Sequence, residues 1–307
     1  MNSNDNIHES MNTPREATAV PVHRLLYWQV RRELWENRSI YIAPLAVAGV
    51  MLLGFLVSTG HLPELALATA GLPPDQETDH LIKVYGMVSV PLILVALAVG
   101  MFYCLDALNN ERRDRSILFW KSLPVSDLLT VASKAAIPML VLPLLTFVIV
   151  VVLQNLMRVI TSVVLLAHGL PVADLWTQLP LLHLTVLLFY ALAVLALWHA
   201  PVYAWLLLVS AWAKRSTFLV AVVPPMALGL AEKIAFGSHH VFSLIGERLF
   251  GGVGEAFAFE RGRAVSDPLL ELDPARFIAS PGLWLGLLAA AGLFYGAVML
   301  RRSRQPL

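Results

Sequence analysis

The chain has 307 residues, of which 58% are hydrophobic and only 14% are charged. An average soluble domain has about 45–50% apolar and about 25% charged residues, and here the apolar residues gather in long runs, which argues against a soluble globular domain. A single cysteine, Cys104, excludes an internal disulfide bond and a cysteine metal cluster, while the net charge of +1 hides an uneven distribution of basic residues.

The first 39 residues precede any apolar run. Residues 1–21 are polar and lack the apolar core of a signal peptide, so they are predicted to form a disordered cytoplasmic tail. Residues 22–39 are predicted to form an amphipathic helix that lies along the cytoplasmic leaflet. Its apolar arc consists of Val22, Leu26, Tyr27, Val30 and Leu34, its basic arc consists of Arg24, Arg31 and Arg38, and His23, Glu33 and Asn37 interrupt the apolar arc. The alternative is a polar preamble whose arginines only set the topology.

Six runs are long and apolar enough to cross a bilayer core of about 30 Å as helices. They are residues 40–58, 84–105, 135–157, 181–213, 217–235 and 281–300. The fourth run would be roughly 50 Å long as a helix, so it is interpreted as one tilted helix kinked at Pro201, with two separate spans as the alternative. The sequence thus predicts an all-α integral membrane protein with one transmembrane domain, at 40–302.

The basic residues orient these spans. With six spans and a cytoplasmic N-terminus, 15 of the 22 lysines and arginines fall in cytoplasmic segments and seven fall outside. Five of those seven lie at or near the long outer segment 236–280, which counts less in the positive-inside rule. A seventh span would move a basic cluster to the wrong side. Both termini are therefore predicted to be cytoplasmic.

The segment 236–280 is rich in glycine and has an aromatic, weakly apolar middle. A short re-entrant helix pair and an ordinary surface loop are both compatible with this composition, because non-helical backbone at membrane depth needs protein or water around it.

The chain lacks the common catalytic motifs. No Gly-Lys pair occurs, so the phosphate-binding loop of an ATPase is missing, and no metalloprotease or hydrolase motif is present. The pair His239–His240 has no third ligand at metal-binding spacing and is interpreted as a surface pair. The chain is therefore predicted not to be an enzyme by itself, and no metal or nucleic-acid site is expected.

Four residues within the spans are candidates for a pathway or a hinge: His199, Pro201, Pro224 and Pro225. A histidine in a span can titrate near neutral pH, and a proline kinks a helix and frees carbonyl groups. The alternatives are that His199 only forms a hydrogen bond and that the kinks only fit the bundle.

The sixth span carries small residues at intervals of three and four on one face. They are Gly282, Gly286, Ala289, Gly292 and Gly296. Such a face allows close helix packing in lipid, either within the chain or with a second copy.

A basic and aromatic loop, 109–127, separates the second span from the third. Its central residues are Arg112, Arg113, Asp114, Arg115, Ile117, Leu118, Phe119, Trp120 and Lys121. Pro124 breaks the chain, and Ser126 with Asp127 is predicted to cap the next helix. The apolar turn is either a membrane-interface anchor or a docking site for a soluble partner.

Two segments resemble a known family. The loop sequence ERRDRSILFWKSLPVSDLLTVASK and the fourth-span sequence APVYAWLLLVSAWAKR are similar to segments of ABC-2 type transporter permeases, and the six-span layout with a leading amphipathic helix fits as well. The resemblance implies a type-2 exporter permease subunit in a bacterial cytoplasmic (inner) membrane. It also implies a second permease copy, as a homodimer or heterodimer, and a separate ATPase subunit that binds ATP and Mg²⁺. Residues 112–121 of this chain would then form the coupling loop that contacts that ATPase. The alternatives are a secondary transporter or channel, or a non-transporting scaffold or sensor.

Overall fold

The structure, a computed structural model, describes residues 21–69, 72–113, 126–258 and 267–303. Within these residues the chain is almost entirely helical. Six stretches are long and apolar enough to cross a membrane, which confirms the predicted number of spans. They are Ser39–Thr69, Gln76–Arg113, Asp127–Ala167, Leu175–Trp212, Thr217–Phe236 and Pro281–Ser303.

One helix precedes the first stretch, and shorter elements make up parts of the first three. In chain order the elements to residue 167 are α1 (Val22–Glu36), α2 (Ser39–Ser58), a 3₁₀ turn (Thr59–His61), α3 (Leu62–Thr69), α4 (Pro74–Met87), α5 (Ser89–Ala107), α6 (Asn109–Arg113), α8 (Asp127–Ala136), a π-helical turn (Ile137–Val141) and α9 (Leu142–Ala167). The remaining elements are α10 (Ala173–Thr177), α11 (Leu181–Trp212), α12 (Thr217–Phe236), α13 (His240–Gly246), a π-helical turn (Glu247–Gly251), α14 (Gly252–Ala256), a 3₁₀ turn (Pro268–Glu271), α15 (Pro274–Ala279) and α16 (Pro281–Ser303).

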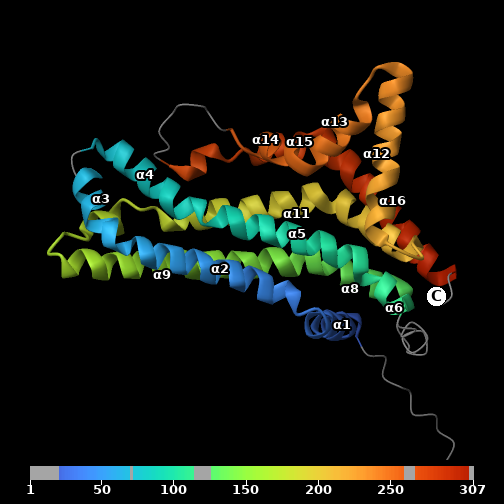
Figure 1. The fold of residues 1–307 in the computed structure, drawn as a ribbon, viewed down its shortest axis with the longest axis horizontal. Helices are drawn as coiled ribbons and strands as arrows, with labels where there is room; N and C mark the ends of the chain where they lie inside the picture. Colours follow the sequence, from blue (N-terminus) through green and yellow to red (C-terminus); the bar gives the residue numbers. More distant parts are fainter. Residues whose placement is uncertain (1–20, 70–71, 114–125, 259–266, 304–307) are drawn as a thin grey trace, which may run out of the picture.

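Four helices, α2, α5, α9 and α11, form an elongated bundle (Figure 1). One apolar cluster around Leu92, Val150 and Leu188 fills the half of the bundle near α3, α4 and α10. A second, around Ile40, Val131 and Leu207, fills the half near α1, α6 and α8. The bundle therefore has a continuous apolar interior, and its outer surface keeps many exposed leucines and valines, as lipid-facing helices do.

The long runs resolve into unbroken helices. The fourth run is one helix, α11, with Pro201 inside it, and not two spans. The third run is predicted to span the membrane to about residue 157 and to continue as a helix into the far interface, and α9 does extend to Ala167. Its polar side chains find partners: Gln154 donates to the Tyr85 carbonyl at 3.0 Å, and Arg158 donates to the Trp176 carbonyl at 3.0 Å. Pro138 lies in the π-helical turn, which accommodates the missing backbone donor.

The segment after α12 folds back on the bundle. Figure 1 shows α12 leaving the bundle at a steep angle, and α13, α14 and α15 returning alongside α11. Trp198, near the middle of α11, is 1% exposed and donates to the Glu247 carbonyl at 3.0 Å. A Cβ atom at Gly252 would lie 2.6 Å from the Trp198 ring, so only glycine permits this approach. The described part of 236–280 thus packs against the middle of a span, as a re-entrant segment would.

Candidate functional site

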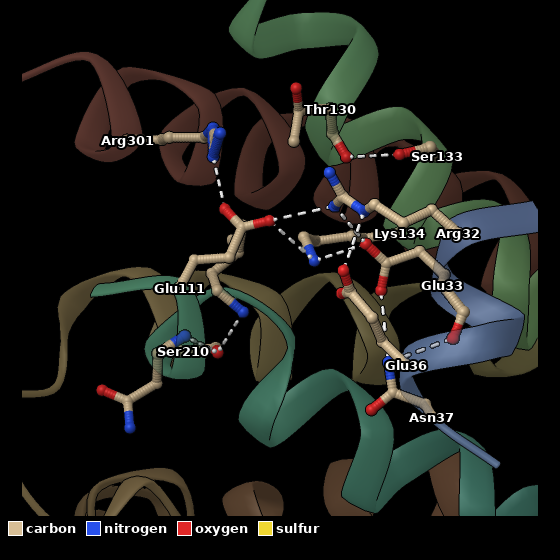
Figure 2. Close-up of polar contacts among 12 residues, drawn as sticks. Arg32, Glu33, Glu36, Asn37, Glu111, Thr130, Ser133, Lys134, Ser210 and Arg301 are labelled. Atoms are coloured by element: carbon tan, nitrogen blue, oxygen red, sulfur yellow. Dashed lines mark hydrogen bonds and ion pairs between the residues drawn. The ribbon is translucent and has the colours of Figure 1, made fainter. Parts of the chain in front are cut away.

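Six charged side chains from four separate helices meet at one end of the bundle. We call these six side chains the charge cluster. They are Arg32 and Glu33 of α1, Glu111 of α6, Asp127 and Lys134 of α8, and Arg301 of α16. Figure 2 shows most of these side chains pointing toward one another. Three acids face three bases, so the charges balance when all six groups are ionised.

Lys134 is the central cation of the cluster. Its ammonium group lies 2.8 Å from a carboxylate oxygen of Glu33 and 3.1 Å from a carboxylate oxygen of Glu111. The side chains of Lys134 and Glu33 are 2% and 1% exposed. Arg32 also lies between these two carboxylates, 2.8 Å from Glu33 and 3.3 Å from Glu111. The two cations together offset the repulsion between the carboxylates where α1, α6 and α8 meet.

Glu33 explains the irregular amphipathicity of the first helix. Its second carboxylate oxygen accepts a hydrogen bond from the Tyr103 hydroxyl at 2.8 Å and one from the Asn37 amide at 3.4 Å. Glu33 and Asn37 are one turn apart on α1, so both face the bundle. Of the polar residues that interrupt the apolar arc, Glu33 binds α1 to α5 and α8, Asn37 supports Glu33, and His23 is exposed.

Arg301 joins the two ends of the undescribed segment 114–125. Its Nη1 donates to Glu111 at 2.9 Å, and its Nε donates to Asp127 at 3.1 Å. Glu111 lies two residues before the last described residue of α6, and Asp127 is the first residue of α8. The end of the last apolar helix thus holds the chain on both sides of the basic and aromatic loop.

Three further side chains, Arg112, Ser210 and Ser126, form hydrogen bonds at the same ends. The Arg112 guanidinium is buried and donates to the carbonyls of Ala211 and Ala213 at 2.8 and 3.1 Å, where a cation suits the C-terminus of α11. The Ser210 hydroxyl accepts from the amides of Leu108 and Asn109, both at 3.0 Å. On the other side, the Ser126 hydroxyl accepts from the Leu129 amide at 3.2 Å, which confirms the predicted helix cap.

The predicted coupling-loop residues separate into two groups. Arg112 is buried against the end of α11, so it supports the base of the loop and does not present a free charge to a partner. Arg113 is exposed. The remaining predicted residues, Asp114, Arg115, Ile117, Leu118, Phe119, Trp120 and Lys121, lie outside the described residues, and their role stays a prediction.

Part of the small-residue face of α16 packs against the same chain, and part of it is exposed. Gly282 packs on Trp198, Gly286 on Arg248, and Gly296 on Leu208, all within the same chain. Ala289 and Gly292 are exposed, and no atom lies within 4 Å of a Cβ built on Gly292. Most of the close approach predicted for this face is therefore used for packing α16 within its own chain.

The predicted pathway or hinge residues do not converge on one site. His199 is 2% exposed, and its Nδ1 forms a hydrogen bond with the Leu195 carbonyl one turn earlier at 2.9 Å. Pro201 lies two residues later in the same helix, whereas Pro224 and Pro225 lie in the separate helix α12. Among the described residues no group of three His, Cys, Asp or Glu side chains has metal-binding geometry, and His240 instead contacts Glu232 at 2.8 Å.

A cavity of about 200 Å³ lies at the opposite end of the bundle, bounded by α3, α4, α9 and α10. Its lining is mainly apolar, with the Tyr85 and Thr161 hydroxyls hydrogen-bonded to each other at 3.1 Å. No charged cluster comparable to that around Lys134 accompanies it among the residues that line it, so the charge cluster remains the principal candidate site.

The environment of Glu33 shifts its ionisation. Burial by itself raises the pKa of this carboxyl group, but the positive charges of Lys134 and Arg32 and the hydrogen bonds from Lys134 and Tyr103 outweigh it. The pKa therefore lies below its ordinary value of 4.5. Glu33 is expected to be ionised near neutral pH, as the balanced cluster requires.

We expect acid to weaken the docking of α1. A depressed pKa in the folded state contributes stability above the ordinary value of 4.5, and this contribution disappears as the pH falls through the lower folded-state pKa. The thermal unfolding midpoint of the detergent-solubilised protein should fall on acidification below about pH 4.5, and it should fall less steeply in Glu33→Gln. Identical pH dependence in both proteins would contradict this assignment.

The apolar helices define the class of this chain, a multi-pass helical membrane protein. Comparisons with protein-family models, with curated proteins and with solved structures gave no match. Any narrower assignment therefore depends on the chain's own sequence and contacts.

Proposed function

We propose that this chain is the membrane-spanning permease subunit of an ATP-binding cassette exporter of the ABC-2 type. A separate nucleotide-binding subunit would bind ATP and Mg²⁺ and dock on the loop that contains residues 114–125. Two permease copies would surround the substrate path and move between inward-facing and outward-facing states in a bacterial cytoplasmic membrane, with both termini in the cytoplasm.

The observation that carries the proposal is the Arg301 bridge. A loop that transmits force needs ends that move with the spans, and Arg301 connects Glu111 and Asp127 to α16 by bonds of 2.9 and 3.1 Å. Lys134 extends the same connection to α1 through Glu33. A displacement of the loop would therefore be transmitted to α1, α6, α8 and α16 together.

The sequence supports the same division of labour. The chain has no Gly-Lys pair and so no phosphate-binding loop of its own, whereas the loop residues Phe119 and Trp120 are the kind of apolar anchors that bind in protein clefts. A secondary transporter or a scaffold would need no ATPase on this loop, so the presence of that partner separates the alternatives.

We expect an ATPase to co-purify with the protein from native membranes in mild detergent, and to be lost when the loop is altered. The loop variant combines Arg115→Glu, Phe119→Ala and Trp120→Ala. The matched control combines Lys233→Glu, Phe236→Ala and Phe250→Ala, which removes one positive charge and two aromatic rings from exposed positions on α12 and the following segment.

The proposal predicts a chain with the sequence G-x-x-x-x-G-K-S/T in the wild-type and control samples but not in the loop variant. Absence of such a chain from folded wild-type protein, or its retention by the loop variant, would contradict the proposal. The secondary-transporter or scaffold alternatives would then be preferred.

A further inference from the structure

The first helix lies across the end of the bundle. Figure 1 shows α1 nearly end-on, whereas α2, α5, α9 and α11 run across the view. An apolar bundle that crosses a membrane places a perpendicular helix at its end in the plane of the membrane surface. Position alone therefore brings α1 to the level of the lipid headgroups.

The rotation of α1 about its own axis is fixed by its contacts with the bundle. Val30 and Leu34 pack on the apolar cluster around Ile40 and Leu207, and Glu33 is held by Lys134 and Tyr103. The part of the apolar arc formed by Val30 and Leu34 is therefore packed against the protein itself, whereas Tyr27 at the edge of that arc is exposed. The exposed side of α1 must contact whatever lies outside.

That face carries an exposed stripe of aromatic and basic residues. The exposed stripe comprises Arg24, Tyr27, Trp28, Arg31, Trp35 and Arg38. Tyr27, Trp28 and Trp35 are 60%, 57% and 71% exposed. Arg24, Tyr27, Trp28, Arg31 and Trp35 lie on one side of α1, because Arg24 is three and four residues before Tyr27 and Trp28, and Arg31 is three residues after Trp28 and four before Trp35.

The centre of the stripe is an arginine between two tryptophans. The Arg31 guanidinium carbon lies 5.2 Å from the Trp28 ring centre and 5.5 Å from the Trp35 ring centre. These contacts hold a cation at the level of two indole rings. Arg24 repeats the charge seven residues earlier on α1, and Arg38 adds a third exposed arginine in the turn between α1 and α2. None of the six stripe residues is acidic.

We propose that the exposed stripe binds the anionic headgroups of phospholipids at the membrane surface. Tryptophan and tyrosine prefer the headgroup region because their rings are apolar with one polar edge, and arginine pairs with phosphate through a planar set of donors. Three exposed arginines spread along α1 and the turn after it match a continuous anionic surface better than a single pocket does. The inference needs the spans to cross a membrane, but it does not depend on the proposed ATPase partner.

A single fluorescent label tests the contact. The only native cysteine, Cys104, is 0% exposed, so a cysteine introduced as Tyr27→Cys can be labelled selectively on the stripe. The labelled protein is placed in nanodiscs of phosphatidylcholine alone or with added phosphatidylglycerol. Access of acrylamide to the label is then measured, because this quencher is neutral and is not repelled by anionic lipid.

We expect phosphatidylglycerol to reduce acrylamide quenching at least twofold. The combination Arg24→Gln, Arg31→Gln and Arg38→Gln should abolish this protection. A charge-matched control with Lys214→Gln, Arg215→Gln and Arg302→Gln, three exposed residues elsewhere in the chain, should retain it. Size-exclusion profiles and melting temperatures check that all three proteins are folded.

Two results would overturn the inference. One is equal quenching of the folded wild-type stripe with and without phosphatidylglycerol. The other is protection that appears only when a soluble protein fraction is added, which would make the stripe a protein interface. Neither result bears on whether an ATPase binds the 114–125 loop, so the two proposals fail independently.

Discussion

Lys134→Met is expected to reduce the free energy of unfolding by about 3–5 kcal/mol, because Arg32 and Arg301 alone cannot balance the three acids of the charge cluster and a buried negative charge is left in excess. Glu33 and Glu111 lie 2.8 and 3.1 Å from the Lys134 ammonium, and the lysine side chain is 2% exposed. Methionine nearly preserves the length of the side chain, so the effect reports the charge. Chemical denaturation of the detergent-solubilised protein measures the change.

An exposed lysine provides the control. Lys83 pairs with Asp79 one turn away on α4, and its side chain is 62% exposed. A surface pair of this kind contributes about 0–1 kcal/mol, so Lys83→Met should have little effect. Adding Glu33→Gln to Lys134→Met should restore part of the stability, since Arg32 and Arg301 then balance Glu111 and Asp127. A small loss in the single variant, or no recovery in the double variant, would contradict the buried cluster.

Arg301→Met is expected to loosen both ends of the loop without unfolding the bundle. A hydrogen bond to a charged group contributes about 1.5–3 kcal/mol, and Arg301 makes such bonds to Glu111 and Asp127. Since each 1.4 kcal/mol is tenfold in an equilibrium constant, amide exchange should accelerate roughly ten- to a hundredfold in α6 and at Leu129 and Thr130 of α8.

Arg302 is the natural comparison for Arg301. It is adjacent on α16 and exposed, so Arg302→Met removes the same charge without touching the bridge. Hydrogen exchange followed by mass spectrometry should show no acceleration in α6 or α8 for this variant. Equal acceleration in the two variants, or acceleration throughout α9 and α11 in Arg301→Met, would show that the bridge is not a local connection.

The sequence specifies the spans well because hydropathy is a local property. Runs of about 20 apolar residues marked all six crossing helices, and the Ser126 cap followed from a local hydrogen-bonding preference. The partners of Gln154 and Arg158 on α9 were harder to predict, because they are the carbonyls of Tyr85, 69 residues away, and of Trp176, 18 residues away.

The charge cluster was not predicted, and the reason is physical. The local sequence around a lysine or arginine beside a span does not show whether its side chain is solvated or buried. From the sequence, Lys134 and Arg301 therefore indicated only which side of the membrane their segments occupy. Their partners Glu33 and Glu111 lie 101 and 190 residues away, respectively. The one local signal was Glu33 within the apolar arc, but His23 interrupts the same arc and is exposed, so the interruption alone did not distinguish a docked residue from a solvated one.

The proposal that the loop docks on an ATPase is tested most directly by a photo-cross-link from the loop in native membranes. Phe119→Cys is labelled with a photoreactive maleimide, since Cys104 is buried, and a label on Thr59→Cys at the other end of the bundle serves as the control. If the loop docks on an ATPase, the Phe119 label will cross-link to a separate chain carrying G-x-x-x-x-G-K-S/T, and the Thr59 label will not. Cross-links from the Phe119 label only to lipid or to this chain would contradict the claim that the loop docks on an ATPase.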